Sequence, residues 1–156
     1  RIGRMVAELF RGIGNSVMGY DLYPDEKWAK EKGVNLKSFD EVIAKSDILT
    51  LHIPAKNDNS PVIGFNEIEK MKSNSFLINL ARGGIVDETA LYDALLSKKL
   101  AGAAIDVFSI EPYEGPLCEL KNVVLTPHIG SYAKEGKLQM EIDATNNLIN
   151  VLINEI

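Results

Sequence analysis

The chain has 156 residues, which suits one domain better than two, and its 46% hydrophobic and 25% charged residues are ordinary for a soluble globular protein. Its 17 basic and 22 acidic residues give a net charge of −5, which argues against binding to nucleic acid or to an anionic membrane. The single cysteine, Cys118, excludes an intrachain disulfide. The sequence offers neither a signal-peptide pattern nor an apolar run of the ~20 residues that span a membrane. We therefore expect a reducing, cytoplasmic location.

Short apolar runs alternate with amphipathic stretches along the chain. Strands are predicted at 15–20, 47–53, 75–80, 101–108 and 122–126. Most of these runs are apolar at consecutive positions, which is typical of strands buried on both faces of a parallel sheet. Helices are predicted at 4–10, 25–32, 39–44, 66–71, 87–98 and about 132–153. This alternation predicts an α/β fold, a doubly wound parallel sheet of the Rossmann type.

The start of the chain contains part of a dinucleotide-binding pattern. Gly3 precedes a predicted helix, and Asp21 stands at the end of the next predicted strand. In G-x-G-x-x-G motifs the last glycine permits close helix–strand packing, and a later acid binds the ribose hydroxyls of NAD and repels the extra phosphate of NADP. Because two of the three glycines would precede residue 1, we expect residues 1–156 to be a dinucleotide-binding domain that is incomplete at its N-terminus and lacks its first strand.

Polar side chains follow three of the predicted strands. Arg82 comes after 75–80, Glu111 after 101–108, and His128 after 122–126. Ligands of open parallel sheets bind beyond the carboxyl ends of the strands, so we expect the three side chains at one edge of the sheet.

These three residue types suit a redox step between a carbonyl and an alcohol. Arg82 can hold a substrate carboxylate with two parallel hydrogen bonds, and His128 can exchange a proton with the carbonyl oxygen near neutral pH. Glu111 can orient the imidazole and favour its charged form. The two histidines, His52 and His128, lie far apart in the sequence, so no metal site is expected, and the hydride has to come from a cofactor.

Several segments resemble the NAD-binding domain of the D-isomer-specific 2-hydroxyacid dehydrogenases, and are most like the phosphoglycerate dehydrogenase-like members. The segment Asn79-Leu80-Ala81-Arg82-Gly83-Gly84 is the most specific. The other matching segments, in family order, are 3–4, 19–21, 51–54, 85–88, 102–108, 111–112 and 126–130.

The resemblance implies an oxidoreductase that transfers a hydride between NAD and a D-2-hydroxy acid and 2-oxo acid pair, with 3-phosphoglycerate among the possible substrates. It implies that Arg82 anchors the substrate, that His128 with Glu111 performs acid–base catalysis, that Asp21 binds the adenosine ribose, and that Asp106 lies near the nicotinamide amide. The cofactor-binding residues that it implies are Ile2, Gly3, Arg4, Asp21, His52, Pro54, Ala81, Arg82, Asp106, His128 and Gly130.

The resemblance also implies a homodimer and a separate substrate domain outside these residues. We therefore expect the 156-residue chain alone to bind NAD weakly and to be inactive. The loop 55–60 lacks the threonines usual in the family, and the chain reads Ser131-Tyr132-Ala133 where many members have Ala-x-Thr, so the substrate acid stays open. The alternative function is an NAD-sensing binding module, similar to transcriptional co-repressors related to this family.

Each candidate residue also has a structural interpretation. Arg82 could be a surface arginine in a glycine-rich turn, His128 a helix-capping residue, and Glu111 a solvated loop acid. His52, which lies at a strand end before Pro54, is expected to be structural rather than catalytic. Asp87 is expected to cap the helix at 87–98.

Overall fold

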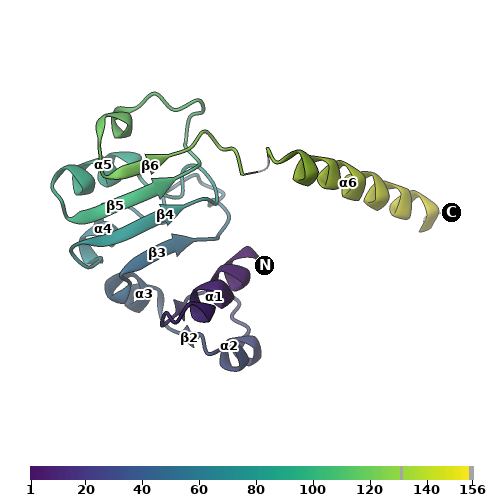
Figure 1. The fold of residues 1–156 in the computed structure, drawn as a ribbon, viewed down its shortest axis with the longest axis horizontal. Coiled ribbons are helices and arrows are strands. Elements are labelled where there is room, and N and C mark those ends of the chain that lie inside the picture. Colours follow the sequence, from purple (N-terminus) through teal and green to yellow (C-terminus); the bar gives the residue numbers. More distant parts are fainter. Residues whose placement is uncertain (131, 155–156) are drawn as a thin grey trace.

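The computed structural model describes residues 1–130 and 132–154. Its elements in chain order are α1 (Ile2–Gly12), β1 (Met18–Gly19), α2 (Glu26–Lys32), β2 (Asn35–Leu36), α3 (Phe39–Lys45), β3 (Ile48–Leu51), α4 (Phe65–Lys70), β4 (Ser75–Asn79), α5 (Glu88–Leu96), β5 (Leu100–Ile105), the 3₁₀-helix η1 (Pro116–Glu119), β6 (Val123–Leu125) and α6 (Lys134–Asn154). The predicted α/β architecture is confirmed (Figure 1).

All strand pairs in the described residues are parallel. One sheet has the order β3-β4-β5-β6, and the register aligns Leu77 of β4 with Ala103 of β5, which in turn aligns with Val123 of β6. The second sheet contains only β1 and β2, and no described strand joins β1 to β3. In the strand order 3-2-1-4-5-6 of dinucleotide-binding folds, β2 and β1 correspond to strands 3 and 2, and β3 to strand 4.

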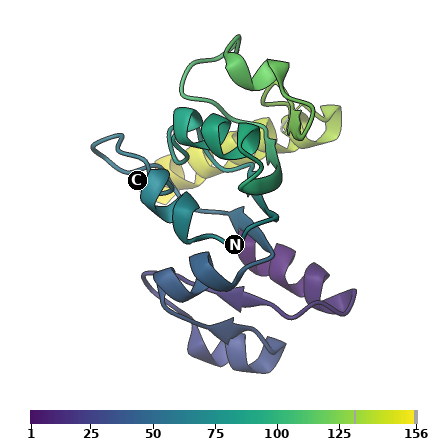
Figure 2. The same cartoon turned by 90° about the vertical axis from the view of Figure 1, so that its left-hand side faces the viewer.

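The core lies between the four-stranded sheet and helices α3, α4 and α5, which cover one face (Figures 1 and 2). Leu77, Leu91 and Leu95 are fully or almost fully buried there. The expectation that the strands are buried on both faces is wrong for the opposite face, where Ile48, Phe76 and Val124 are 46%, 46% and 63% exposed. The described helices leave these side chains uncovered.

The structure contains two elements that the apolar pattern did not predict. Strand β2 has two residues and carries no apolar run. It was not predicted because its place is set by pairing with β1 and not by its own sequence. The 3₁₀-helix η1 begins at Pro116, a residue suited to the first turn of a helix. The other predicted helices and strands are present, with ends shifted by a few residues.

Side-chain caps set several helix ends. Asp87 caps α5 as predicted, since its carboxylate accepts hydrogen bonds from the backbone N–H groups of Thr89 and Ala90. Helix α3 begins with a capping box in which Ser38 and Glu41 each accept from the other's backbone N–H. These caps fix where α3 and α5 start relative to the strands that they cover.

Helix α6 projects away from the sheet (Figure 1). The predicted apolar face of Leu138, Ile142, Ile149 and Leu152 is 43–56% exposed in the structure. Among residues 1–130 and 132–154, no helix combines the length and the hydropathy that crossing a membrane requires.

Candidate active site

The loop after β4 is shaped by the last residue of that strand. The buried Asn79 donates a hydrogen bond from Nδ2 to the carbonyl oxygen of Arg82 (3.0 Å) and accepts one from the backbone N–H of Ala81 (3.1 Å). A Cβ atom at Gly83 would lie 1.9 Å from the carbonyl oxygen of Phe108, so only glycine lets this loop approach the loop after β5 so closely. The two loops are therefore packed together at the carboxyl edge of the sheet.

Arg82 lies exposed in this loop. Its Nη1 donates to the carbonyl oxygen of Ala81 (2.6 Å), and it forms no ion pair within the described part of the chain. The structure thus places Arg82 at the expected edge but does not bring its guanidinium into contact with Glu111 or His128. Its positive charge is available to an anionic ligand such as a carboxylate.

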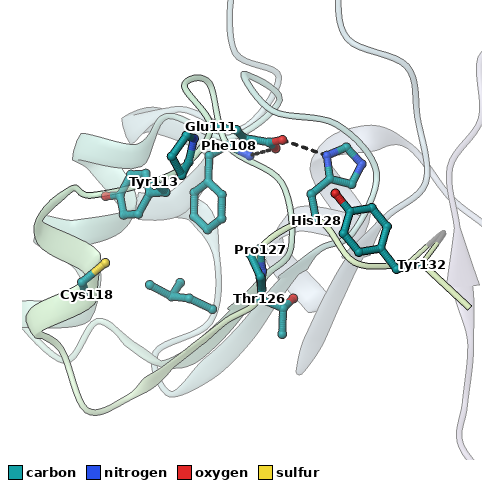
Figure 3. A pocket seen from close by; sticks show the side chains of 10 residues that line it. Phe108, Glu111, Tyr113, Cys118, Thr126, Pro127, His128 and Tyr132 are labelled. Atoms are coloured by element: carbon teal, nitrogen blue, oxygen red, sulfur yellow. Dashed lines mark hydrogen bonds and ion pairs between the residues drawn. The ribbon is translucent and has the colours of Figure 1, made fainter.

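The loops after β5 and β6 bring Glu111 and His128 into contact. The distance from His128 Nδ1 to Glu111 Oε2 is 2.9 Å, and Figure 3 shows the other ring nitrogen turned away from the carboxylate. Glu111 Oε1 also accepts a hydrogen bond from the backbone N–H of Phe108 (3.0 Å). The Phe108 N–H, and after it the His128 ring, hold the pKa of Glu111 below its usual value, so its carboxylate stays ionised and can orient the imidazole.

His128 has an unusual backbone conformation. Its φ is +54°, in the left-handed region, which costs a non-glycine residue about 1–2 kcal/mol. Such a conformation persists only where surrounding contacts hold it, and it is concentrated at functional sites.

Asp106 holds the segment on both sides of His128. This buried carboxylate follows β5, and its Oδ1 accepts hydrogen bonds from the Thr126 hydroxyl and from the backbone N–H of Ile129. No role is predicted for Thr126 from the sequence. The sequence signal that could have found it is a hydroxyl residue directly before Pro127-His128, at the end of a predicted strand. The neighbouring predicted strand carries the acid Asp106 near its end.

His52 follows β3 and contacts the first turn of α1. Its Nε2 lies 3.1 Å from Thr50 Oγ1, and burial lowers its pKa, which favours the neutral imidazole. A Cβ atom at Gly3 would lie 3.3 Å from His52 Cβ, so Gly3 permits close packing of α1 on this strand end. This geometry suits the structural interpretation of His52. Pro54 lies exposed in the following loop.

Asp21 and Arg4 differ in what they contact. Asp21 is exposed after β1, and its carboxylate accepts a hydrogen bond from the Tyr23 backbone N–H (2.9 Å). Arg4 pairs with Asp25 (2.9 Å) and lies over the Trp28 ring, 5.0 Å from its centroid, so its side chain is directed to α2.

These residues fit a dinucleotide. The N-terminal N–H groups of an 11-residue helix, α1, suit a pyrophosphate, and the exposed Asp21 carboxylate suits a ribose diol. Asp106 Oδ2 lies on the side of Gly130, where a Cβ atom would be 3.6 Å away. No group of three or more possible metal-ligating side chains occurs in the described ranges.

A cavity of about 610 Å³ adjoins the Glu111–His128 pair (Figure 3). Its walls are mainly aromatic and apolar. The lining residues are Phe108, Glu111, Pro112, Tyr113, Cys118, Leu125, Thr126, Pro127, His128 and Tyr132.

Comparisons with known proteins give one consistent family. Residues 1–130 match the model of the D-isomer specific 2-hydroxyacid dehydrogenase, NAD binding domain. A D-3-phosphoglycerate dehydrogenase of Archaeoglobus fulgidus is 39% identical to this chain, in an alignment that covers 97% of this chain and 29% of the relative. An aromatic 2-oxoacid reductase of Clostridium sporogenes is 42% identical, in an alignment that covers 90% of this chain and 46% of the relative.

Solved structures give the same result. A D-lactate dehydrogenase of Aquifex aeolicus, complexed with NAD and lactic acid, superposes with a TM-score of 0.85 at 32% identity, over 98% of this chain and 50% of that one. A glyoxylate reductase of Paecilomyes thermophila superposes with a TM-score of 0.87 at 35% identity, over 94% of this chain and 45% of that one. The chain thus spans half or less of the length of these relatives.

Proposed function

This chain belongs to the D-isomer-specific 2-hydroxyacid dehydrogenase family, whose NAD-binding domain it matches, and we propose that it serves an enzyme that transfers a hydride between NAD and a D-2-hydroxy acid and 2-oxo acid pair. The observation that carries this proposal is the 2.9 Å contact of His128 with Glu111 at the carboxyl edge of the sheet. Arg82 in the neighbouring loop adds the cation that a 2-hydroxy acid requires.

Each of the three residues has one task in the proposed reaction. Arg82 binds the substrate carboxylate and fixes the carbon that reacts. His128 takes the hydroxyl proton on its Nε2 during oxidation and returns it during reduction. Glu111, bonded to Nδ1, orients the ring and stabilises the imidazolium that forms. NAD, when bound, supplies the hydride acceptor or donor.

The cofactor residues are assigned by position. We propose that Ile2, Gly3 and Arg4, in the first turn of α1, lie along the pyrophosphate, and that Asp21 binds the adenosine ribose. The nicotinamide half is proposed to lie along the strand ends, near His52, Pro54, Ala81, Arg82, Asp106, His128 and Gly130.

The relatives suggest several acids as the substrate of the proposed enzyme. Relatives named for 3-phosphoglycerate support that substrate as one candidate, while others are named for glyoxylate or for aromatic 2-oxo acids. We also propose a cytoplasmic homodimer. Exposed apolar residues on α1, Met5 and Leu9, support a contact surface that the described residues leave open.

Turnover by the full-length protein tests the function. Glyoxylate, pyruvate, phenylpyruvate and 3-phosphohydroxypyruvate would each be offered with NADH and with NADPH, and we expect oxidation of NADH with at least one of them. His128→Ala should lower kcat by about 10²–10⁴-fold, a loss far larger than its effect on NADH binding. Near-wild-type turnover by His128→Ala would contradict the assignment. Binding of a peptide partner without turnover of any acid would favour an NAD sensor.

A further inference from the structure

The segment that carries His128 is tied to a single carboxylate oxygen on the neighbouring strand. Thr126 precedes Pro127-His128 and Ile129 follows them, and both donate hydrogen bonds to Oδ1 of Asp106. The backbone N–H of Thr126 continues the strand pairing by donating to Ile105 O (3.0 Å). Its hydroxyl is therefore held in a fixed direction, toward the buried acid.

This attachment matters because the segment has little else to hold its shape. Proline has no backbone N–H to donate, so Pro127 cannot extend the ladder of β6. His128 has a φ of +54°, a conformation that a non-glycine residue leaves readily when its surroundings permit. Glu111 fixes the imidazole end of His128, while Asp106 holds the Thr126 side chain before it and the Ile129 backbone N–H after it.

We propose that Thr126 is a positioning residue that acts through Asp106 to keep His128 in its left-handed conformation and its Nδ1 against Glu111. This inference rests on the proposed function only for its effect on turnover. The Thr126 hydroxyl is engaged by Asp106 Oδ1, while Oδ2 lies toward Gly130, on the side proposed for the nicotinamide. Changing Thr126 therefore loosens the segment without removing a group that contacts the cofactor.

The test compares two substitutions in the full-length protein, one that keeps the size of threonine and one that keeps its hydroxyl. Thr126→Val removes the hydroxyl, whereas Thr126→Ser retains it. A displacement of about 1 Å of a reacting group lowers rates by as much as about 100-fold, so we expect Thr126→Val to lower kcat by about 10–100-fold. The KM for the 2-oxo acid and the Kd for NADH should change by less than about threefold, since the binding groups are untouched. Thr126→Ser should restore most of kcat.

A second readout does not require turnover. In the wild-type protein without NAD, the Nδ1–H proton of His128 that bonds to Glu111 should give a downfield NMR signal, assigned by its loss in His128→Gln. Thr126→Val should broaden or abolish this signal, and Thr126→Ser should keep it.

The outcomes separate this proposal from the proposed function. If the wild type reduces none of the acids, the proposed function fails, but the NMR signal still decides the role of Thr126. A folded Thr126→Val protein with an unchanged signal and unchanged kcat would overturn the inference, as would equal losses in Thr126→Val and Thr126→Ser. Should Thr126→Val fail to fold, Thr126→Ala carries the same comparison with Thr126→Ser.

Discussion

The two histidines show that surroundings, more than residue type, decide what a side chain can do. His52 and His128 both follow a strand of the same sheet. His52 is half-buried against α1 and bonded to Thr50, and burial lowers its pKa, so it suits a neutral packing role. His128 is more exposed, is paired with the ionised Glu111, and has its second nitrogen turned outward, which suits proton exchange.

Gly83 offers a sharp test of the contact between the site loops. In Gly83→Ala the new Cβ would lie 1.9 Å from a backbone carbonyl oxygen, so the β4 and β5 loops have to separate. Overpacking of this kind destabilises a protein by about 1–3 kcal/mol. Gly12→Ala is the matched control, because nothing lies within 4 Å of its Cβ position and alanine favours a helix. Urea unfolding should show a loss for Gly83→Ala alone, and equal stability of the two variants would refute the described packing.

Asp21 is expected to set the choice between NAD and NADP. Its carboxylate is exposed after β1 and carries the charge that would repel a 2′-phosphate. Asp21→Asn keeps a hydrogen-bond acceptor but removes this charge, so it should narrow the preference for NADH over NADPH by about tenfold, the amount expected for a charged hydrogen bond. Fluorescence titration with both cofactors measures this change. Asp93→Asn, an exposed change on α5, should leave both affinities as they are.

At the scale of elements, the sequence predicted what depends on local pattern and missed what depends on partners. Continuous apolar runs located β3 to β6, and the Asp87 cap located the start of α5. Strand β2 was missed because its two residues become a strand only by pairing with β1.

The candidate site shows the same division. The strand ends placed Arg82, Glu111 and His128 at one edge, and the structure joins two of them. The direction of the Arg82 guanidinium, toward Ala81 O, could not be read from the sequence, because several rotamers of a long exposed side chain are compatible with one backbone. The Thr126–Asp106 hydrogen bond was missed because it depends on the β5–β6 register. The roles of these residues stay predictions.

The capping box of α3 makes a prediction about pH. Glu41 bonds to Lys45 (2.8 Å) and to the Ser38 backbone, and these contacts lower its pKa from 4.5 to about 2. A pKa lowered by folding stabilises the protein above the unfolded value, and this contribution is lost as the pH falls from about 4.5 toward 2. Glu41→Gln should therefore lower Tm at pH 7 and match the wild type near pH 2.

Glu31→Gln is the control for this pH dependence. Glu31 is exposed on α2 and makes no ion pair or side-chain hydrogen bond within the residues that the structure describes. The two variants would be compared by thermal unfolding across the pH range. A Tm difference for Glu41→Gln that stays constant down to pH 2 would show that the ionised carboxylate is not what stabilises α3.

At the scale of the whole molecule, three elements or faces each carry several exposed apolar side chains. They lie on α1, on the open face of the four-stranded sheet and along α6, and include Leu9 (69%), Val124 (63%) and Leu138 (56%). Where several exposed apolar side chains share one element, other parts of a protein or a partner often cover them. The chain also spans half or less of the length of its relatives. Both observations bear on whether the 156-residue chain can bind its cofactor and act by itself.

We expect the 156-residue chain alone to bind NADH weakly and to reduce no 2-oxo acid. The His128 and Glu111 side chains are 44% and 37% exposed, and Arg82 is exposed as well, so water screens the Arg82 charge that we propose binds the acid. Closure of an active site expels water and strengthens the electrostatic interactions inside it, and the described residues leave the His128–Glu111 pair partly exposed. The measurement is NADH binding by fluorescence, followed by NADH oxidation with the four acids, with the full-length protein as the reference. A turnover rate of the chain that equals the reference would show that the open edge of the sheet is already a complete active site.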